Sequence, residues 1–191
     1  MFSSNKNKPK NVDAKKVRGY IYRDLAKREW ARKMLVQKII GKCGKEHMDL
    51  IEEVMQEFVD EDLQSDERFS ECYIRDCRDN RGYGPIKTKM KLMEKGVSAS
   101  VFETYLASCH EIWQVRCAQV QMRKYGQAPS DRNEYASQMR FLTQRGFTNE
   151  HIKKACYDNK SWNERPEILT PEEEVDNSID LEYVKAIINQ G

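Results

Sequence analysis

The stretch LMEKGVS at Leu92–Ser98 returns fifty residues later as LTQRGFT at Leu142–Thr148. Each copy reads as the end of one helix followed by the start of the next. A leucine takes the last buried position, and a cation follows where the helix carbonyls lack partners. Gly96 and Gly146 can adopt the positive φ of a helix C′ residue. The apolar residue after each glycine is expected to fold back onto the helix that has just ended. The hydroxyl residue after that is expected to cap the next helix. The repeat predicts stacked helical units that cannot bury their apolar faces alone.

The whole chain is predicted to be all-α, because no alternating strand pattern bounded by turns occurs in it. Trp113, Cys117 and Val120, for example, mark one face of a helix expected from about His110 to Tyr125. We expect an elongated, curved array of three tandem three-helix repeats, about nine helices, with a short C-terminal extension. The expected parts are a disordered basic arm at 1–12, repeats at 13–64, 65–109 and 110–158, and an acidic tail with one short candidate helix at 159–191.

Local signals mark several helix ends. Asp13 and Asp131 are candidate N-caps, and Pro85 suits the first position of a helix. A weaker third copy of the repeated turn is expected at Gly44, where Lys45 replaces the apolar residue that follows the other two glycines.

The composition favours a thin core. Of 191 residues, 39% are hydrophobic and 34% are charged, which argues for an elongated stack with much exposed surface. No apolar run is long enough for a transmembrane helix, and the first residues are polar and contain lysine, unlike a secretory signal. We therefore expect a cytoplasmic protein with no membrane contact. Its six cysteines include no CxxC pair and are expected to be reduced thiols that act as small hydrophobic residues.

The net charge of +2 conceals an asymmetry between two parts of the chain. Residues 161–191 hold eight acidic and two basic residues, a net charge of −6, which leaves +8 on residues 1–160. A basic body with an acidic tail suggests a polyanionic partner and an internal competitor for it. Ordinary solubilising charge is the alternative interpretation.

The sequence shows little sign of catalysis. Three histidines lie far apart in sequence without local acid partners, and no GxGxxG, P-loop or GxSxG motif is present. Gly82-Tyr83-Gly84 fits a tight turn better than a phosphate loop. We expect no enzymatic activity, no cofactor and no metal site.

Basic residues recur at helical spacing and are the candidate binding residues. Such stripes are often only the solvated side of a helix, but several of them in a stacked array would form an extended cationic surface for phosphates or an acidic protein groove. Tyr83 and Tyr125 are the only clear loop aromatics that could stack on bases. The candidate residues are Arg68, Arg75, Arg78, Arg81, Lys87, Lys91, Lys95, Arg116, Arg123, Arg140 and Arg145.

Over about residues 17–158 the chain resembles the RecX family. The order and spacing of its motifs carry the resemblance: Arg28–Arg32 (REWAR), Asp66–Phe69 (DERF), Tyr73–Arg75 (YIR), Arg81–Gly84 (RGYG), Lys95–Val97 (KGV), Arg140–Leu142 (RFL) and Arg145–Phe147 (RGF). The resemblance implies three tandem three-helix repeats.

The resemblance also implies a cytoplasmic, non-catalytic regulator of the RecA recombinase. Such a protein would bind RecA filaments on single-stranded DNA and suppress ATP hydrolysis and strand exchange. The expected partners are thus the RecA filament and single-stranded DNA, directly or through RecA, and we expect a monomer. Two other functions stay open: a sequence-independent single-stranded DNA-binding protein, or a helical adaptor for another protein.

Overall fold

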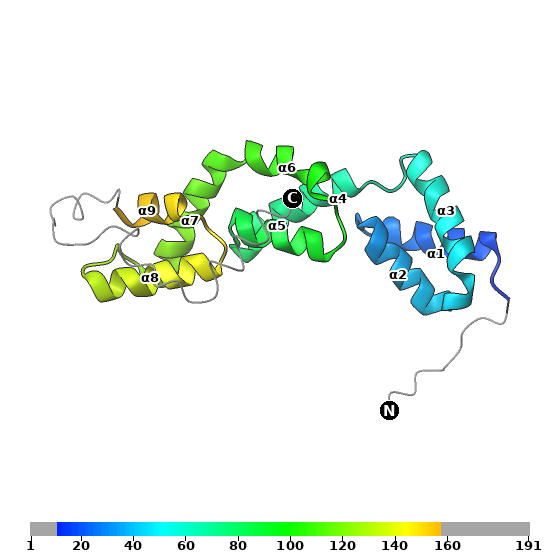
Figure 1. Cartoon of the computed structure of the whole chain (residues 1–191), viewed down its shortest axis with the longest axis horizontal. Coiled ribbons are helices and arrows are strands. Elements are labelled where there is room, and N and C mark those ends of the chain that lie inside the picture. The colour runs from blue at the N-terminus through cyan, green and yellow to red at the C-terminus, as the bar shows by residue number, and fades with distance from the viewer. Residues whose placement is uncertain (1–10, 158–191) are drawn as a thin grey trace, which may run out of the picture. The chain divides into compact units, whose positions relative to one another are not determined.

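The computed structural model describes residues 11–157, and within them the predicted all-α fold is confirmed. The described residues form nine α-helices and no strand (Figure 1). The predicted acidic tail and all but the last two residues of the predicted basic arm lie outside the described residues.

No helix among the described residues is both long and apolar enough to cross a membrane. The helices are α1 Ala14–Leu25, α2 Arg32–Cys43, α3 Met48–Asp60, α4 Asp66–Asp76, α5 Pro85–Glu94, α6 Ala99–Ser108, α7 His110–Tyr125, α8 Arg132–Gln144 and α9 Asn149–Tyr157.

The chain divides into two compact units, and the division runs through α4, α5 and α6. Unit 1 contains the residues up to Cys72 together with Leu92–Phe102. Unit 2 contains Tyr73–Lys91 and the residues from Glu103 onward. The repeat boundaries at residues 13, 65 and 110 stay a prediction.

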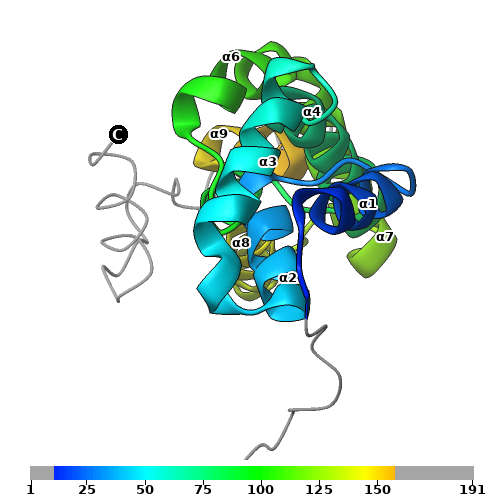
Figure 2. The same ribbon diagram turned by 90° about the vertical axis from the view of Figure 1, so that its right-hand side faces the viewer.

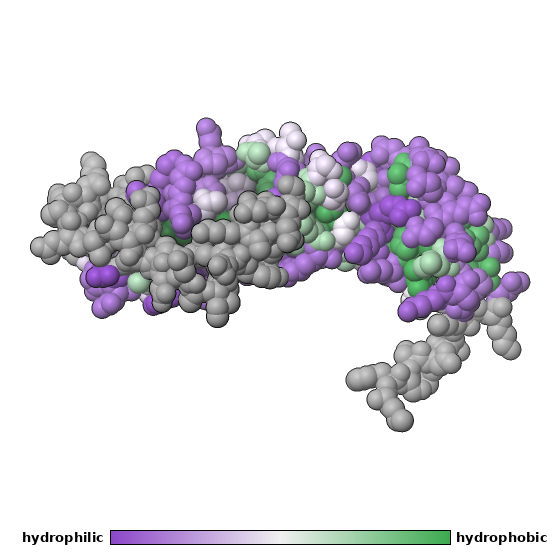
Figure 3. Space-filling model, in the orientation of Figure 1, coloured by the Kyte–Doolittle hydropathy of each residue, from purple (hydrophilic) through white to green (hydrophobic). Residues whose placement is uncertain are grey.

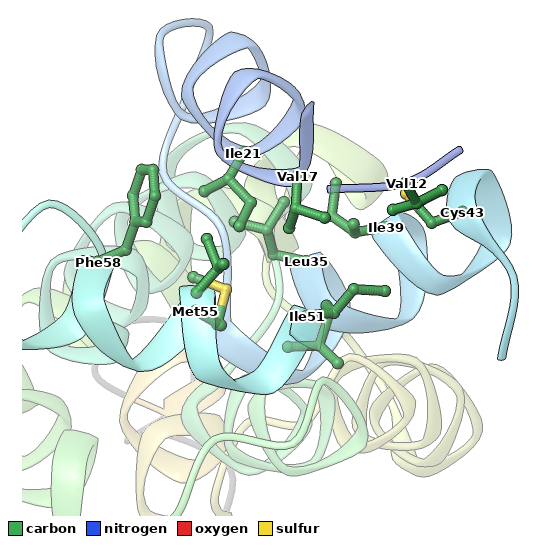
Figure 4. Close-up of a cluster of buried hydrophobic side chains, with 11 residues drawn as sticks. Val12, Val17, Ile21, Leu35, Ile39, Cys43, Ile51, Met55 and Phe58 are labelled. Atoms are coloured by element: carbon green, nitrogen blue, oxygen red, sulfur yellow. The ribbon is translucent and has the colours of Figure 1, made fainter. Parts of the chain in front are cut away.

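The core of unit 1 is built from α1, α2 and α3, which pack pairwise against one another (Figures 1 and 2). Figure 4 shows Ile21, Leu35 and Met55, from the three helices, pointing into one cluster. Phe58 extends this cluster and makes an edge contact with the Tyr22 ring at 4.7 Å between centroids. On the face drawn in Figure 3, hydrophilic residues cover most of these helices, as expected for amphipathic helices around a small core.

The two copies of the repeated turn form the predicted helix end. After α5, Val97 N–H donates to Leu92 O at 3.2 Å and Gly96 N–H donates to Met93 O at 2.8 Å. After α8, Phe147 N–H donates to Leu142 O at 3.2 Å and the Gly146 amide to Thr143 O at 2.8 Å. This pair of bonds defines the Schellman motif, with glycine at C′ and an apolar contact between C″ and C3. Gly96 and Gly146 have φ values of +86° and +85°.

The hydroxyl caps and the third copy differ in detail. Thr148 Oγ1 accepts from His151 N–H at 3.3 Å, as predicted, whereas the Ser98 hydroxyl lies 2.9 Å from the Ser100 hydroxyl. Gly44 has φ +110° and ψ 151°, a different conformation, and a 3₁₀ turn over Lys45–His47 follows it. Lys45, a charged residue, is exposed where Val97 and Phe147 are buried, so the fold-back contact is missing there.

Predicted caps are confirmed at two helices. Asp13 Oδ1 accepts from Lys16 N–H and Asp131 Oδ1 from Glu134 N–H, both at 2.8 Å. Pro85 is the first residue of α5, as predicted. One feature was not predicted: α4 ends at Asp76 and continues as a π-helical turn over Cys77–Arg81.

The start of α5 lies against the turn between α8 and α9 within unit 2. Gly84 N–H donates to Arg145 O at 2.7 Å, and Ile86 N–H donates to Gly146 O at 3.0 Å. A Cβ added at Gly84 would overlap the Gly146 carbonyl, and one added at Gly146 would overlap the Lys87 backbone. We call this contact the glycine joint, defined by Gly84 and Gly146. Unit 1 holds a counterpart, because a Cβ at Gly96 would overlap the side chain of Lys33 near the start of α2.

Gly84→Ala is expected to destabilise the protein by about 2–3 kcal/mol, because the added methyl forces two backbone segments apart. The φ of Gly84 is not positive, so backbone strain does not contribute. Guanidinium denaturation followed by circular dichroism at 222 nm measures the loss.

Gly19→Ala is the matched control for that variant. Gly19 lies inside α1 with nothing within 4 Å of an added Cβ, so alanine should stabilise the helix by about 0.5–1 kcal/mol. Equal effects of the two substitutions would contradict the glycine joint.

Candidate nucleic-acid and protein interface

In unit 2, cations and aromatic rings gather around the glycine joint and the neighbouring ends of α7 and α8. We call this group the cation–aromatic cluster. Its members come from the loop before α5, from α5 itself, from the C-terminal end of α7, from α8 and from the turn after α8. They are Tyr83, Lys87, Lys124, Tyr125, Phe141 and Arg145.

The Phe141 ring is the centre of the cluster. Lys124 Nζ lies 3.7 Å from its centroid and Arg145 Cζ lies 5.1 Å from it. The Tyr125 ring meets Phe141 edge-on, with centroids 5.8 Å apart and an interplanar angle of 81°. Cations at these distances are attracted by the negative face of the ring. The packing of α7 against α8 therefore places two positive charges on one half-buried aromatic surface.

The glycine joint positions the other half of the cluster. Lys87 Nζ lies 4.7 Å from the Tyr83 ring centroid and donates to Gln144 O at 3.0 Å. Arg145 Nη1 donates to Arg81 O at 2.9 Å. These bonds to carbonyl groups hold the cations in place without neutralising them.

The positive charge of the cluster is not balanced locally. Within residues 11–157, Lys87, Lys124 and Arg145 form no ion pair with a carboxylate. Arg123 and Arg140, both exposed, are adjacent in sequence to cluster members and also have no ionic partner in that range. Uncompensated cations beside accessible rings suit a single-stranded nucleic acid, which offers phosphates and base faces.

Several other predicted binding residues have partners inside the protein. Arg78 holds both carboxylate oxygens of Asp79, with Nε–Oδ1 at 2.8 Å and Nη2–Oδ2 at 2.9 Å. Arg116 Nη2 reaches Asp79 Oδ1 at 2.9 Å, so one carboxylate joins two arginines. Hydrogen bonds from Arg78, together with the charge of Arg116, hold the pKa of Asp79 below its usual range. The ion pairs among Arg78, Asp79 and Arg116 therefore stabilise the packing within unit 2.

Arg68 and Arg81 are engaged in the same way. Arg68 in unit 1 reaches Glu29 at 3.1 Å and Asp62 at 2.7 Å. Arg81 Nε lies 2.6 Å from Asp76 Oδ2, and its guanidinium carbon is 5.5 Å from the Tyr73 ring centroid. These arginines orient loops and helix ends of their own unit.

The three lysines of the predicted stripe on the α5 segment fall in different units. Lys87 and Lys91 belong to unit 2 and Lys95 belongs to unit 1, where its Nζ lies 3.9 Å from Met34 Sδ. Lys91, Lys95 and Arg75 interact with further groups of the chain. Of the predicted binding residues, the structure brings Lys87 and Arg145 together at the glycine joint, and the role of all eleven stays a prediction.

Sequence reasoning missed Lys124 and Phe141. Both lie next to residues that it did select, Tyr125 and Arg140. Their contact depends on the packing of α7 against α8, which no local pattern specifies. An aromatic residue at a half-buried position next to a predicted basic stripe was the signal available.

Unit 1 has a second group of cations and rings, but a buried carboxylate neutralises it. Lys38 and Lys42 each place Nζ 2.8 Å from an oxygen of Asp24, which is 4% exposed. Burial alone would raise the pKa of Asp24, but the two lysines lower it below its usual value. Lys38 Nζ also lies 4.1 Å from the Trp30 ring centroid. This group stabilises the α1–α2 contact.

Two histidines that lie far apart in sequence meet in unit 2. The ring centroids of His110 and His151 are 5.4 Å apart, and His110 Nε2 is 3.7 Å from Glu150 Oε2. The expectation covered only acid partners that are local in sequence, whereas the fold brings Glu150 to His110 from forty residues away. Both histidines line a groove of about 560 Å³ with Trp113. Burial lowers the pKa of His151. Within residues 11–157 no cluster of three or more His, Cys, Asp or Glu side chains is suited to a metal ion.

Comparison with known proteins identifies the family. Residues 65–106 match the family model described as RecX, second three-helix domain, and residues 111–156 match RecX, third three-helix domain. The regulatory protein RecX of Halorhodospira halophila is 32% identical over 141 residues, which cover 73% of this chain and 86% of that protein. The chain belongs to the RecX family. The regulatory protein RecX of Pseudomonas entomophila is 35% identical over 67% of this chain and 81% of its own length.

Solved structures of RecX proteins share the fold. The crystal structure of RecX from Lactobacillus salivarius superposes with a TM-score of 0.65 over 74% of this chain and 93% of that chain, at 22% identity. A second crystal structure, of a regulatory protein RecX, also gives a TM-score of 0.65, at 17% identity over 76% of this chain and 73% of that one.

Asp79→Asn is expected to destabilise the protein by about 1–2 kcal/mol at pH 7, because two arginines lose a charged acceptor. The folded-state pKa of Asp79 is depressed, so its contribution is present above the unfolded-state pKa. It is lost as the pH falls through the folded-state pKa. Denaturation curves at several pH values should show the variant and the parent converging below about pH 4.

Glu53→Gln, on the exposed side of α3, is the control and should change stability by less than about 0.5 kcal/mol. A constant gap between Asp79→Asn and the parent down to pH 3 would argue against the arginine–carboxylate trio.

Proposed function

We propose that this chain is a non-catalytic regulator that binds RecA filaments on single-stranded DNA and inhibits their ATPase and strand-exchange activities. Membership of the RecX family supports the regulatory role, because its relatives are named regulatory proteins. The cation–aromatic cluster is the observation that supports direct contact with the DNA of the filament.

The contacts within the chain show which of the predicted binding residues are most available to bind a phosphate. Arg68, Arg78, Arg81 and Arg116 already hold carboxylates, so a phosphate would have to displace an ion pair at each of them. Within residues 11–157, Lys87 and Arg145 donate to carbonyl oxygens and pair with no carboxylate, so their charge stays uncompensated there. The best candidates for phosphate contact are therefore Lys87, Arg145 and the exposed Arg123 and Arg140, together with Lys124.

Inhibition would follow from a preference for one state of the filament. A protein that bridges neighbouring RecA subunits slows growth or ATP hydrolysis only if it binds the less active arrangement more tightly. The glycine joint suits this task, because it fixes the spacing between the loop before α5 and the turn after α8. Unit 2 then acts as a rigid spacer between its contacts and takes no part in chemistry.

Lys124→Ala combined with Arg140→Ala should weaken binding to a fluorescent oligo-dT strand and flatten its salt dependence. Each lost phosphate contact reduces the slope of log K against log salt by about 0.7 for a single strand, so the double variant should lose about 1.4. Fluorescence anisotropy at several salt concentrations gives this slope. Inhibition of the RecA ATPase on the same strand should fall in parallel.

Lys27→Ala combined with Lys45→Ala is the matched control, because it removes two exposed positive charges from unit 1. This control should leave the salt slope and the inhibition near the parent values. If both pairs reduce binding equally, net charge rather than the cluster carries the contact with DNA.

The second candidate function is a sequence-independent single-strand binder that only competes with RecA for DNA. The cation–aromatic cluster favours it as well, since stacking and phosphate contacts need no RecA. A pull-down of purified RecA by the chain without DNA separates the two. Retention of RecA, lost at high salt, supports the regulator, whereas tight oligonucleotide binding without RecA retention supports the competitor.

A further inference from the structure

One face of α7 is unusually apolar for a surface. Among the described residues of unit 2, the large hydrophobic side chains that are more than a third exposed are Ile112, Val115 and Met122, at 44%, 56% and 48%. Their positions are i, i+3 and i+10 of one helix, so they share a single stripe. Exposed apolar residues scattered singly are normal, but a row of them on one helix marks a docking face.

The opposite side of α7 is fully used by the fold. Trp113, Cys117 and Gln121 are each no more than 1% exposed, and they face the helices packed against α7, chiefly α9 and α8. The exposed stripe therefore does not belong to the core of unit 2. It is a second apolar face on a helix that is already anchored.

Two arginines border this stripe; Arg116 already pairs with Asp79, so Arg123 is the one that indicates the charge of the occupant. At 100° per residue, Arg116 and Arg123 lie on one flank of the face, within about 40° of Ile112. Arg123 is exposed and has no ionic partner within residues 11–157. A helix with an apolar stripe and carboxylates beside it fits both features.

We propose that this face receives the chain's own residues Ile179–Asn189, which lie outside the described residues. Leu181, Val184 and Ile188 stand at i, i+3 and i+7, so on a helix they would form one apolar row that could pack on the stripe. Asp180 borders that apolar row on one side, so its carboxylate can face Arg123. The net charge of −6 on residues 161–191 complements the basic body.

The chain is long enough to make this contact. Twenty-one residues separate the end of α9 at Tyr157 from Ile179, and a segment of that length spans up to about 70 Å when extended. Because α9 packs along α7, the segment starts from the same unit. A short tether raises the effective concentration of the segment to the millimolar range, so a weak helix–groove contact suffices. An eleven-residue helix is marginal alone and gains stability on docking.

Docking would cover Arg123, one of the proposed DNA contacts. This consequence rests on the proposed function, whereas the docking itself does not. The segment and the nucleic acid would then compete for the same end of α7, and release of the segment would raise affinity for DNA.

Hydrogen–deuterium exchange on the full chain tests the docking directly. Amides of residues 180–189 are expected to exchange at least about tenfold more slowly than an unstructured peptide. Val115→Asp should return them to unstructured rates while the α9 amides stay protected. Leu181→Asp should give the same release from the segment side without altering unit 2.

Met48→Asp is the matched control, because Met48 is 49% exposed at the start of α3 in unit 1. It should leave the protection of residues 180–189 unchanged. Unstructured exchange rates in the parent chain would overturn the proposal, and so would protection that survives Val115→Asp. Protection that grows with protein concentration would also overturn it, since the occupant would then be a second copy.

Oligonucleotide affinity separates this proposal from the proposed function. If docking is real and DNA binding uses Arg123, Leu181→Asp should tighten oligo-dT binding several-fold at low salt. Loss of protection without tighter binding would support the docking and contradict the role of Arg123 in DNA contact.

Discussion

The close approach of two backbone segments at Gly84 and Gly146 is the constraint on which unit 2 depends. It brings the loop before α5 within hydrogen-bonding distance of the turn after α8, and any larger residue at either glycine would overlap the opposing chain. The same contact sets the positions of Lys87 and Arg145, because each donates to a carbonyl beside the joint. The glycine joint therefore determines both the packing of these segments and the positions of the two cations. In unit 1 the corresponding glycine, Gly96, meets the Lys33 side chain rather than backbone, and its positive φ of +86° favours glycine in addition.

Carboxylates decide which of the many cations remain available to a partner. Asp24, Asp76 and Asp79 each pair with one or two basic side chains, and the pKa of each is lowered, at Asp76 chiefly by a hydrogen bond from the Asn80 amide and then by Arg81. These pairs lie at least partly out of water, so breaking them would leave charges poorly compensated. The cation–aromatic cluster differs because its cations rest on rings and carbonyl dipoles. A passing phosphate can engage them without first breaking an ion pair, and this is a physical reason to place nucleic-acid contact there.

The sequence was a good guide to the helix ends and a poor guide to the surface. The repeated turn predicts its own hydrogen bonds because glycine, an apolar C″ residue and a buried leucine act within six positions of one another. Asp13, Asp131 and Pro85 were likewise predictable, since capping is local. The cation–aromatic cluster around Phe141 was not predictable, because it forms where α7 packs against α8. Nor could charge spacing show that Arg78 and Arg116 share Asp79, a contact that joins residues far apart in the chain.

The exposed face of α7 and the basic cluster at its C-terminal end pose related physical problems. An apolar stripe in water and cations that have no carboxylate partner within residues 11–157 are both unfavourable, and α7 carries the stripe together with two such cations, Arg123 and Lys124. A single occupant that is apolar on one side and acidic beside it relieves both at once. A nucleic acid relieves only the second, because it brings phosphates and base faces but no aliphatic side chains to cover Val115. If both proposals hold, the two kinds of partner would overlap at Arg123 and diverge toward Ile112, and α7 would distinguish between them by which end of the helix each one covers.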